Sequence, residues 1–215
     1  MQYSAAVSQK TFCSKPQQRH SNEPLRWAGP CSREDHLIEK AQNGDLEAFN
    51  ELVLAYQDLV YRQALWILKE EEAAEDAVQD TFLKAYRKIN TFLRGRPFRS
   101  WLLKITTNQC LDMIRKANRH PWLPYERTDP DGNQMDASWI KDPTDTPEQA
   151  VEKAEVGQRI AHAIRLLAPE YRTVVILADL QQLDYAEVSA ILDVPLGTMK
   201  SRLSRARRQL RDALL

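Results

Sequence analysis

Residues 184–208 read DYAEVSAILDVPLGTMKSRLSRARR, and this stretch decides the fold of the second half of the chain. Asp184 and Glu187 form a capping-box pattern, which predicts a short helix over residues 185–192. A four-residue turn containing proline follows, and a basic helix is expected over residues 198–213. A short helix, a tight turn and a basic helix in this order are typical of a helix-turn-helix motif that binds DNA.

The final helix separates apolar from polar side chains when its residues are placed at about 100° intervals. Its predicted buried stripe is Met199, Leu203, Ala206, Leu210 and Leu214. The opposite face and its flanks supply the candidate DNA contacts: Thr198, Lys200, Ser201, Arg202, Arg205 and Arg208. Because the exposed face of a docked helix meets base edges and its flanks meet phosphates, we expect this helix to read duplex DNA. The alternative is a solvated basic helix without a partner.

Charge is segregated along the chain although the net charge is zero. Residues 34–80 hold thirteen acidic and three basic residues, whereas residues 81–119 hold ten basic residues and a single acid. The final segment, residues 197–215, holds six basic residues and one acid. Single-sign blocks often mark partner surfaces, so the two basic blocks predict a polyanion that is contacted at two places.

Composition excludes several classes of protein. Hydrophobic residues make up 43% of the chain and charged residues 28%, which favours a globular protein without a membrane helix or secretory signal. The common catalytic and phosphate-binding signatures are absent, so we expect neither an enzyme nor a cofactor. Cys13, His20 and Cys31 lack a fourth ligand and a zinc-finger spacing, so no metal site is expected. Cys110 is expected in the core, and the low cysteine count favours a reducing cytoplasm.

Prolines outline the domains. None lies between Pro30 and Pro97, which permits long helices, and five lie within residues 119–147. We predict an all-α fold of two small helical domains joined by a flexible acidic linker. The predicted segments are a disordered extension (1–33), a first domain (34–118), the linker (119–146) and a second, helix-turn-helix domain (147–215).

The last helix of the first domain, expected from Phe98 to Asn118, carries a second basic face. Lys104, Asn108, Arg115 and Arg119 share this face, with Trp101 at its edge. Cationic and aromatic side chains together suit single-stranded or melted nucleic acid. The alternative for Trp101 is an ordinary core position.

Three motifs resemble those of bacterial RNA polymerase sigma factors of the extracytoplasmic-function (ECF) group. Residues 75–87 (EDAVQDTFLKAYR) resemble the polymerase-binding helix, and residues 98–112 resemble the promoter-melting helix. Residues 185–208 are similar to the helix-turn-helix that reads the upstream promoter element. Asp193 departs from the family pattern, because the family's turn usually has glycine at this position. Aspartate tolerates the left-handed backbone conformation, so we expect the turn to form nevertheless.

The resemblance implies a sigma factor whose partners are core RNA polymerase, promoter DNA and an anti-sigma factor, and which is a monomer when free. Its polymerase-binding residues would be Asp76, Gln79 and Asp80. The downstream promoter element would be melted by the loop Asn90–Pro97 and the helix after it, through Arg94, Arg96, Arg99, Trp101, Lys104, Asn108, Arg115 and Arg119. A stand-alone helix-turn-helix regulator is the alternative, but it leaves the acidic motif and the first basic helix unexplained.

The linker determines how far apart the two domains can act. Its 28 residues reach roughly 95 Å, more than two turns of DNA. Without polymerase, such a tether lets the domains close on each other and cover their DNA-binding faces. The alternative is an inert spacer without autoinhibition.

Overall fold

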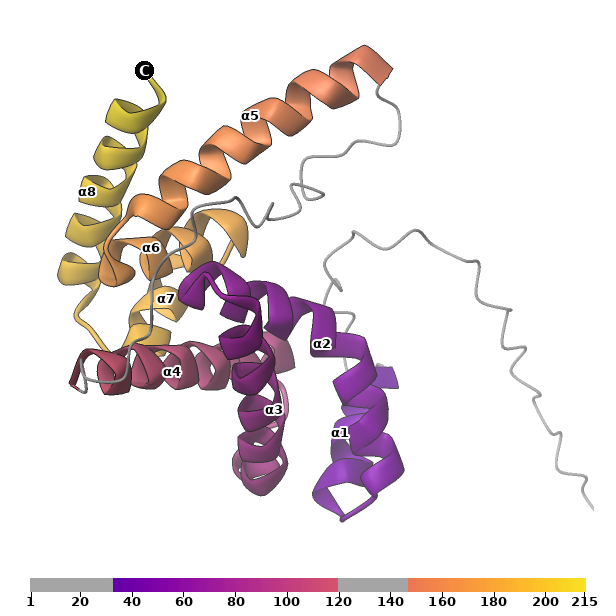
Figure 1. Ribbon diagram of the computed structural model, residues 1–215. Helices are drawn as coiled ribbons and strands as arrows, with labels where there is room; N and C mark the ends of the chain where they lie inside the picture. Colours follow the sequence, from indigo (N-terminus) through magenta and orange to yellow (C-terminus); the bar gives the residue numbers. More distant parts are fainter. Residues whose placement is uncertain (1–32, 120–146) are drawn as a thin grey trace, which may run out of the picture.

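The structure is a computed structural model that describes residues 33–119 and 147–215. In the first range the elements are α1 (Arg33–Gln42), α2 (Leu46–Leu68), α3 (Glu71–Lys88), the 3-10 turn η1 (Ile89–Thr91) and α4 (Phe98–Arg119). In the second range they are α5 (Pro147–Leu166), α6 (Pro169–Val175), the π-helical turn η3 (Ile176–Leu180), α7 (Tyr185–Leu192) and α8 (Leu196–Leu214). All of these elements are helical, which confirms the predicted all-α, two-domain fold (Figure 1).

Several predicted features lie outside the described residues. They are the amino-terminal extension up to Ser32, the linker from His120 to Thr146, and the residues Cys13, His20 and Cys31. Within the described ranges, no helix combines the length and the apolar composition needed to cross a bilayer.

Local side-chain bonds explain where several helices begin and end. The Asp45 carboxylate accepts a hydrogen bond from the Ala48 amide at 3.1 Å and caps α2. Asp184 and Glu187 form the predicted reciprocal capping box at the start of α7. Asp193 ends α7 in the left-handed conformation, with a φ of 52°. Aspartate adopts this conformation more readily than most residues, so the chain can turn here without glycine.

Two predicted helix boundaries were wrong. Helix α8 begins at Leu196 rather than Thr198, because Pro195 already occupies the N-cap position and the turn is one residue shorter. The apolar residues Val174, Val175 and Leu177 also predict a helix from Glu170 to Ala178, but α6 does not continue regularly to Ala178. It passes into the π-helical turn Ile176–Leu180. At the end of this turn the Gln181 amide donates a hydrogen bond to the Ile176 carbonyl five residues earlier, which is the π-helical pattern.

The first domain is built around an aromatic cluster. Phe92, Phe98 and Trp101 pack with ring centroids 5.4 Å apart, and Tyr56 meets Phe98 at the same separation. Phe92 and Phe98 are almost completely buried. This cluster fixes the start of α4 and the loop before it on the core formed by α1, α2 and α3.

Helix α4 lies between the two domains and packs against α2 and α3 on one side and α7 on the other (Figure 1). One continuous apolar cluster crosses this boundary. It includes Trp66, Ile67, Leu103 and Cys110 from the first domain, and Ile164, Ile176, Leu177 and Met199 from the second. The domains therefore share buried surface rather than lying apart.

Cys110 belongs to this shared cluster and is fully buried, as predicted. Burial raises the pKa of its thiol to about 12, because the thiolate would lose its hydration. The side chain therefore stays protonated at neutral pH and serves as a small apolar group.

Candidate nucleic-acid interface

The first candidate surface is the outer face of α8. Lys200, Ser201, Arg205 and Arg208 are exposed there, whereas Met199, Leu203 and Ala206 are buried beneath them. Thr198 and Arg202 are half-buried. The predicted division of this helix into an apolar and a basic face is therefore present in the structure.

The turn before α8 is fixed by side-chain bonds. Ser189 donates its hydroxyl proton to the Val194 carbonyl at 2.6 Å, which closes the turn. Arg207 on the flank of α8 forms an ion pair with Asp179 at 2.5 Å. Hydrogen bonding to Asp179 raises the pKa of Arg207. Because these bonds hold α8 against its own domain, its exposed face is presented in a fixed orientation.

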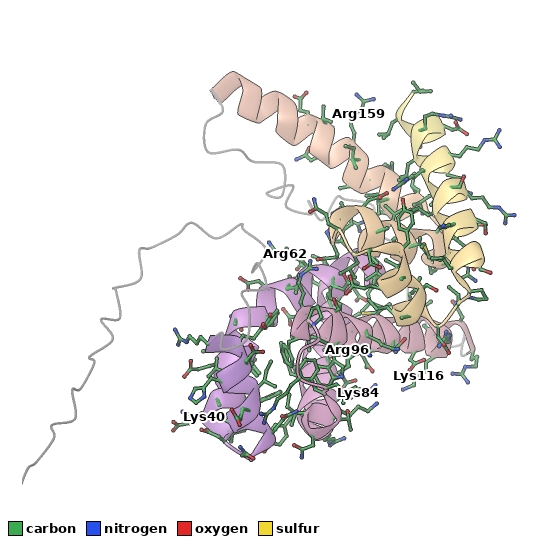
Figure 2. All side chains as sticks on the ribbon, turned by 180° about the vertical axis from the view of Figure 1, so that it is seen from behind. Lys40, Arg62, Lys84, Arg96, Lys116 and Arg159 are labelled. Carbon is green, nitrogen blue, oxygen red and sulfur yellow. The ribbon has the colours of Figure 1, made fainter. Side chains whose placement is uncertain are left out.

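The second candidate surface is the outer face of α4. Lys104, Asn108, Arg115 and Arg119 are all exposed, and Arg115 pairs with Asp112 at 2.9 Å. In Figure 2 the labelled Lys116 marks the carboxyl-terminal end of this helix, beside the helices of the second domain. Trp101 is half-buried against Phe92 and Phe98, so the core alternative accounts for most of its ring.

Two of the arginines that were predicted to contact DNA form hydrogen bonds within the protein. Arg94 pairs with Glu39 at 3.1 Å and donates to the Gln42 side chain at 3.1 Å. Arg99 is half-buried and donates to the second domain. Arg96, in contrast, is exposed on the loop.

The third candidate surface is the acidic face of α3. Asp76, Gln79 and Asp80 are exposed together on this helix. The Asp80 carboxylate accepts a hydrogen bond from the buried Gln109 amide at 2.5 Å, and Lys84 donates to the other end of that amide. In the sequence, Gln109 stands at helical spacing within an otherwise apolar stripe that includes Ile105 and Met113. A polar side chain in such a stripe is a signal that it has a buried partner.

Hydrogen bonds join α4 to the second domain, and the sequence analysis did not predict them. Arg99 donates to the Gln181 carbonyl at 3.1 Å and to its side-chain oxygen at 2.5 Å. Ser100 donates to the Glu187 carboxylate at 2.9 Å. Burial lowers the pKa of Arg99, while Tyr56 and Glu187 act in the opposite direction.

A groove runs between α4 and the second domain. Its walls bring residues of both candidate DNA surfaces together: Lys104, Asn108 and Arg115 from α4, and Arg202 from α8. The other wall includes Ile191, Asp193 and Val194 at the end of α7. In this arrangement, α4 faces the second domain with part of the surface that was predicted to contact DNA.

Comparison with known proteins identifies the two domains. The chain matches the family models of Sigma-70 region 2 over residues 52–120 and Sigma-70 region 4 over residues 157–210. It is 35% identical over 177 residues to the ECF RNA polymerase sigma factor SigW of Bacillus subtilis, covering 82% of this chain and 94% of SigW. It is 31% identical over 172 residues to the ECF sigma-E factor of Escherichia coli K12, covering 80% of this chain and 88% of that protein.

Two solved structures of sigma factors are similar to this chain in fold. The sigma factor RpoE of Bartonella quintana, in complex with the anti-sigma factor NepR, superposes with a TM-score of 0.57 at 26% identity, covering 77% of this chain and 96% of RpoE. CnrH in complex with the cytosolic domain of CnrY gives a TM-score of 0.56 at 25% identity, covering 84% of this chain and 96% of CnrH.

A region 2 domain and a region 4 helix-turn-helix domain on one chain define a transcription initiation factor of the sigma type. The chain belongs to the ECF group of RNA polymerase sigma factors, and it directs RNA polymerase to promoters.

The contact between Arg99 and Gln181 predicts a measurable effect on free-chain DNA binding. Gln181→Lys places a second cation beside Arg99 and disfavours closure on α4, so we expect the free full-length chain to bind single-stranded DNA of the downstream element about tenfold more tightly, equivalent to ~1.4 kcal/mol. Fluorescence anisotropy measures this affinity.

The matched control is Gln182→Lys, which adds the same charge at the neighbouring exposed position. Affinity equal to that of this control would show that domain closure does not compete with DNA and that the linker acts as a spacer only.

Proposed function

We propose that residues 34–118 bind core polymerase and melt the downstream promoter element, while residues 147–215 read the upstream element as duplex DNA. The linker at 119–146 spans the distance between them. The observation that carries this division is the presence of two exposed basic helix faces on separate domains, with an acidic face on α3. A stand-alone regulator needs only one of these three surfaces.

Upstream recognition belongs to α8 in this proposal. Arg205 and Arg208 are exposed near the middle of the helix, flanked by Lys200 and Ser201. Arginine can donate two hydrogen bonds to one guanine, which contributes roughly 1–3 kcal/mol of discrimination against a wrong base. Lys200 contributes phosphate contacts that set the register of the helix on the duplex.

Downstream melting belongs to α4 and the loop Asn90–Pro97. Asn108 is exposed between Lys104 and Arg115, so an amide that can read a base lies among cations that can hold the phosphate backbone. Extruding a base from a duplex costs a few kcal/mol, which contacts to the flipped base must offset. The exposed edge of Trp101 and the loop residue Arg96 adjoin this face and complete the proposed contact set, together with Arg99 when it is released from Gln181.

Polymerase docking belongs to the exposed face of Asp76, Gln79 and Asp80. The clustered acids and the amide suit a basic surface on the polymerase. Because Gln109 binds Asp80, the docking face on α3 is tied to the helix that is proposed to melt DNA.

The free factor is proposed to be a closed cytoplasmic monomer without catalytic activity. Its DNA-binding residue Arg99 is engaged by the second domain, and the groove encloses part of the α4 face. RpoE and CnrH were each solved with a partner protein, an anti-sigma factor and the cytosolic domain of CnrY, respectively. By analogy, we propose that an anti-sigma factor stabilises the closed form of this chain.

The docking surface is tested best at Asp76, because reversing Asp80 would also break its bond to Gln109. Asp76→Lys is expected to weaken core-polymerase binding about tenfold and to make it less sensitive to salt, since an attractive charge becomes repulsive. Titration of labelled core enzyme at two salt concentrations measures both effects. Glu47→Lys, an exposed reversal on α2, is the control. Equal affinity and an equal salt slope for the two variants would refute the assignment.

The two DNA surfaces are distinguished by the form of DNA they require. Arg205→Ala is expected to reduce upstream-duplex affinity about tenfold and to blur its base preference. Asn108→Ala is expected to slow open-complex formation on duplex promoters, with a smaller defect on a pre-melted promoter. Permanganate footprinting of holoenzyme complexes on both templates measures this difference. If pre-melting rescued Arg205→Ala but not Asn108→Ala, the two roles would be reversed.

A further inference from the structure

No residue of helix α1 is among the contacts proposed above for polymerase or DNA. The region 2 family model begins at residue 52, so α1 and the start of α2 lie outside it. Nevertheless α1 packs against α2 and contacts η1, the turn that begins the loop leading to α4. Three hydrogen bonds to the loop side involve one residue, Gln42, the last residue of α1.

Gln42 binds three points of the loop with one amide group. Its nitrogen donates to the Ile89 carbonyl and to the Phe92 carbonyl, each at 3.0 Å. Its oxygen accepts a hydrogen bond from the Arg94 side chain at 3.1 Å. A primary amide has two N–H donors and one acceptor oxygen, so glutamine satisfies all three bonds at once.

A second contact from α1 strengthens the same attachment. Glu39, one turn before Gln42, pairs with Arg94 at 3.1 Å. The pair is about half exposed, so its own contribution to stability is small. Its effect is to direct the Arg94 side chain back toward α1 rather than outward.

These bonds leave a defined part of the loop projecting. Phe92 is 5% exposed and anchored in the aromatic cluster, whereas the next residue, Leu93, is 64% exposed. Gly95 has a φ of 84°, a left-handed conformation that lets the chain turn back toward Pro97. The projecting tip therefore consists of residues 93–96, held on one side by Gln42 and on the other by the start of α4.

We propose that Gln42 is a positioning residue for promoter recognition: it sets the conformation of the loop tip and thereby the base preference at the downstream element. This inference rests on the proposed role of the loop Asn90–Pro97 in capturing a melted base. Gln42 itself would act through the loop rather than by touching DNA, because its amide is fully engaged with Ile89, Phe92 and Arg94.

Two substitutions separate the bonds. Gln42→Leu keeps a similar volume and removes all three bonds. Gln42→Glu retains an acceptor for Arg94 but loses both donors and places a carboxylate against two carbonyl oxygens. If the donors position the loop, both variants share the same defect, whereas the Arg94 contact alone would be preserved in Gln42→Glu. Gln57→Leu, at an exposed position of α2, is the matched control.

The readout is base discrimination by holoenzyme on pre-melted promoter DNA. A 2-aminopurine beside the captured base of the non-template strand reports unstacking, and the preferred base is compared with its three substitutions. We expect Gln42→Leu and Gln42→Glu to lower the discrimination ratio about fivefold to tenfold, while core binding and upstream-duplex binding remain within twofold of Gln57→Leu. Unchanged discrimination in both folded variants would overturn the proposal.

Two further observations keep the outcome unambiguous. If the unsubstituted factor showed no discrimination, the proposed capture of a base by this loop would fail, which differs from a failure confined to Gln42. If both Gln42 variants unfolded, Glu39→Gln would replace them, because it weakens the exposed Arg94 attachment without leaving a buried gap. We expect this variant to lower discrimination about twofold, and a ratio equal to that of Gln57→Leu would then overturn the proposal.

Discussion

The burial of α4 between two domains is the constraint on which the rest of the structure depends. Leu102 and Leu103 on this helix have no exposed surface, and neither has Cys110 two turns further on. Leu103 and Cys110 belong to the cluster that continues into the second domain through Ile176 and Leu177. Apolar burial of this kind is the main force that holds the domains together, and it has little directionality. The directional part comes from Arg99 and Ser100, whose bonds fix how the second domain lies on α4.

This constraint has a consequence for activity. Separating the domains exposes apolar surface of the shared cluster and breaks the Arg99 bonds to Gln181, so opening costs free energy. A partner that covers the same surface compensates for that cost, which suits the proposal that the free factor is closed and opens on polymerase. The same helix carries the exposed Asn108 and, through Gln109, holds Asp80 on the face of α3 that is proposed to dock on polymerase. The surfaces proposed for polymerase docking and DNA melting, and the contact between the domains, thus all involve α4.

Local patterns in the sequence were sufficient for much of the fold. The capping residues Asp45 and Asp184 act within three or four residues of their own helices, and the apolar stripe of α8 follows helical periodicity. The candidate residues on α8 and α3 were likewise found from spacing, from charge and from the family resemblance. Long-range pairs were not predictable in this way. Gln42 reaches a loop about fifty residues away, and Arg99 meets Gln181 across eighty-two positions. Side chains with two or more hydrogen-bonding groups are compatible with many partners, and only the packed structure selects one.

Competition for α4 between the second domain and promoter DNA is the central claim, and the distance between domains tests it most directly. Fluorophores at Glu47→Cys on α2 and Gln209→Cys on α8 would be attached in a chain carrying Cys13→Ser and Cys31→Ser, since buried Cys110 reacts poorly. Single-molecule energy transfer is then recorded for the free factor and for holoenzyme. We predict one population at high transfer efficiency for the free factor and a shift to low efficiency on core-polymerase binding. The same distribution in both states would contradict the competition for α4.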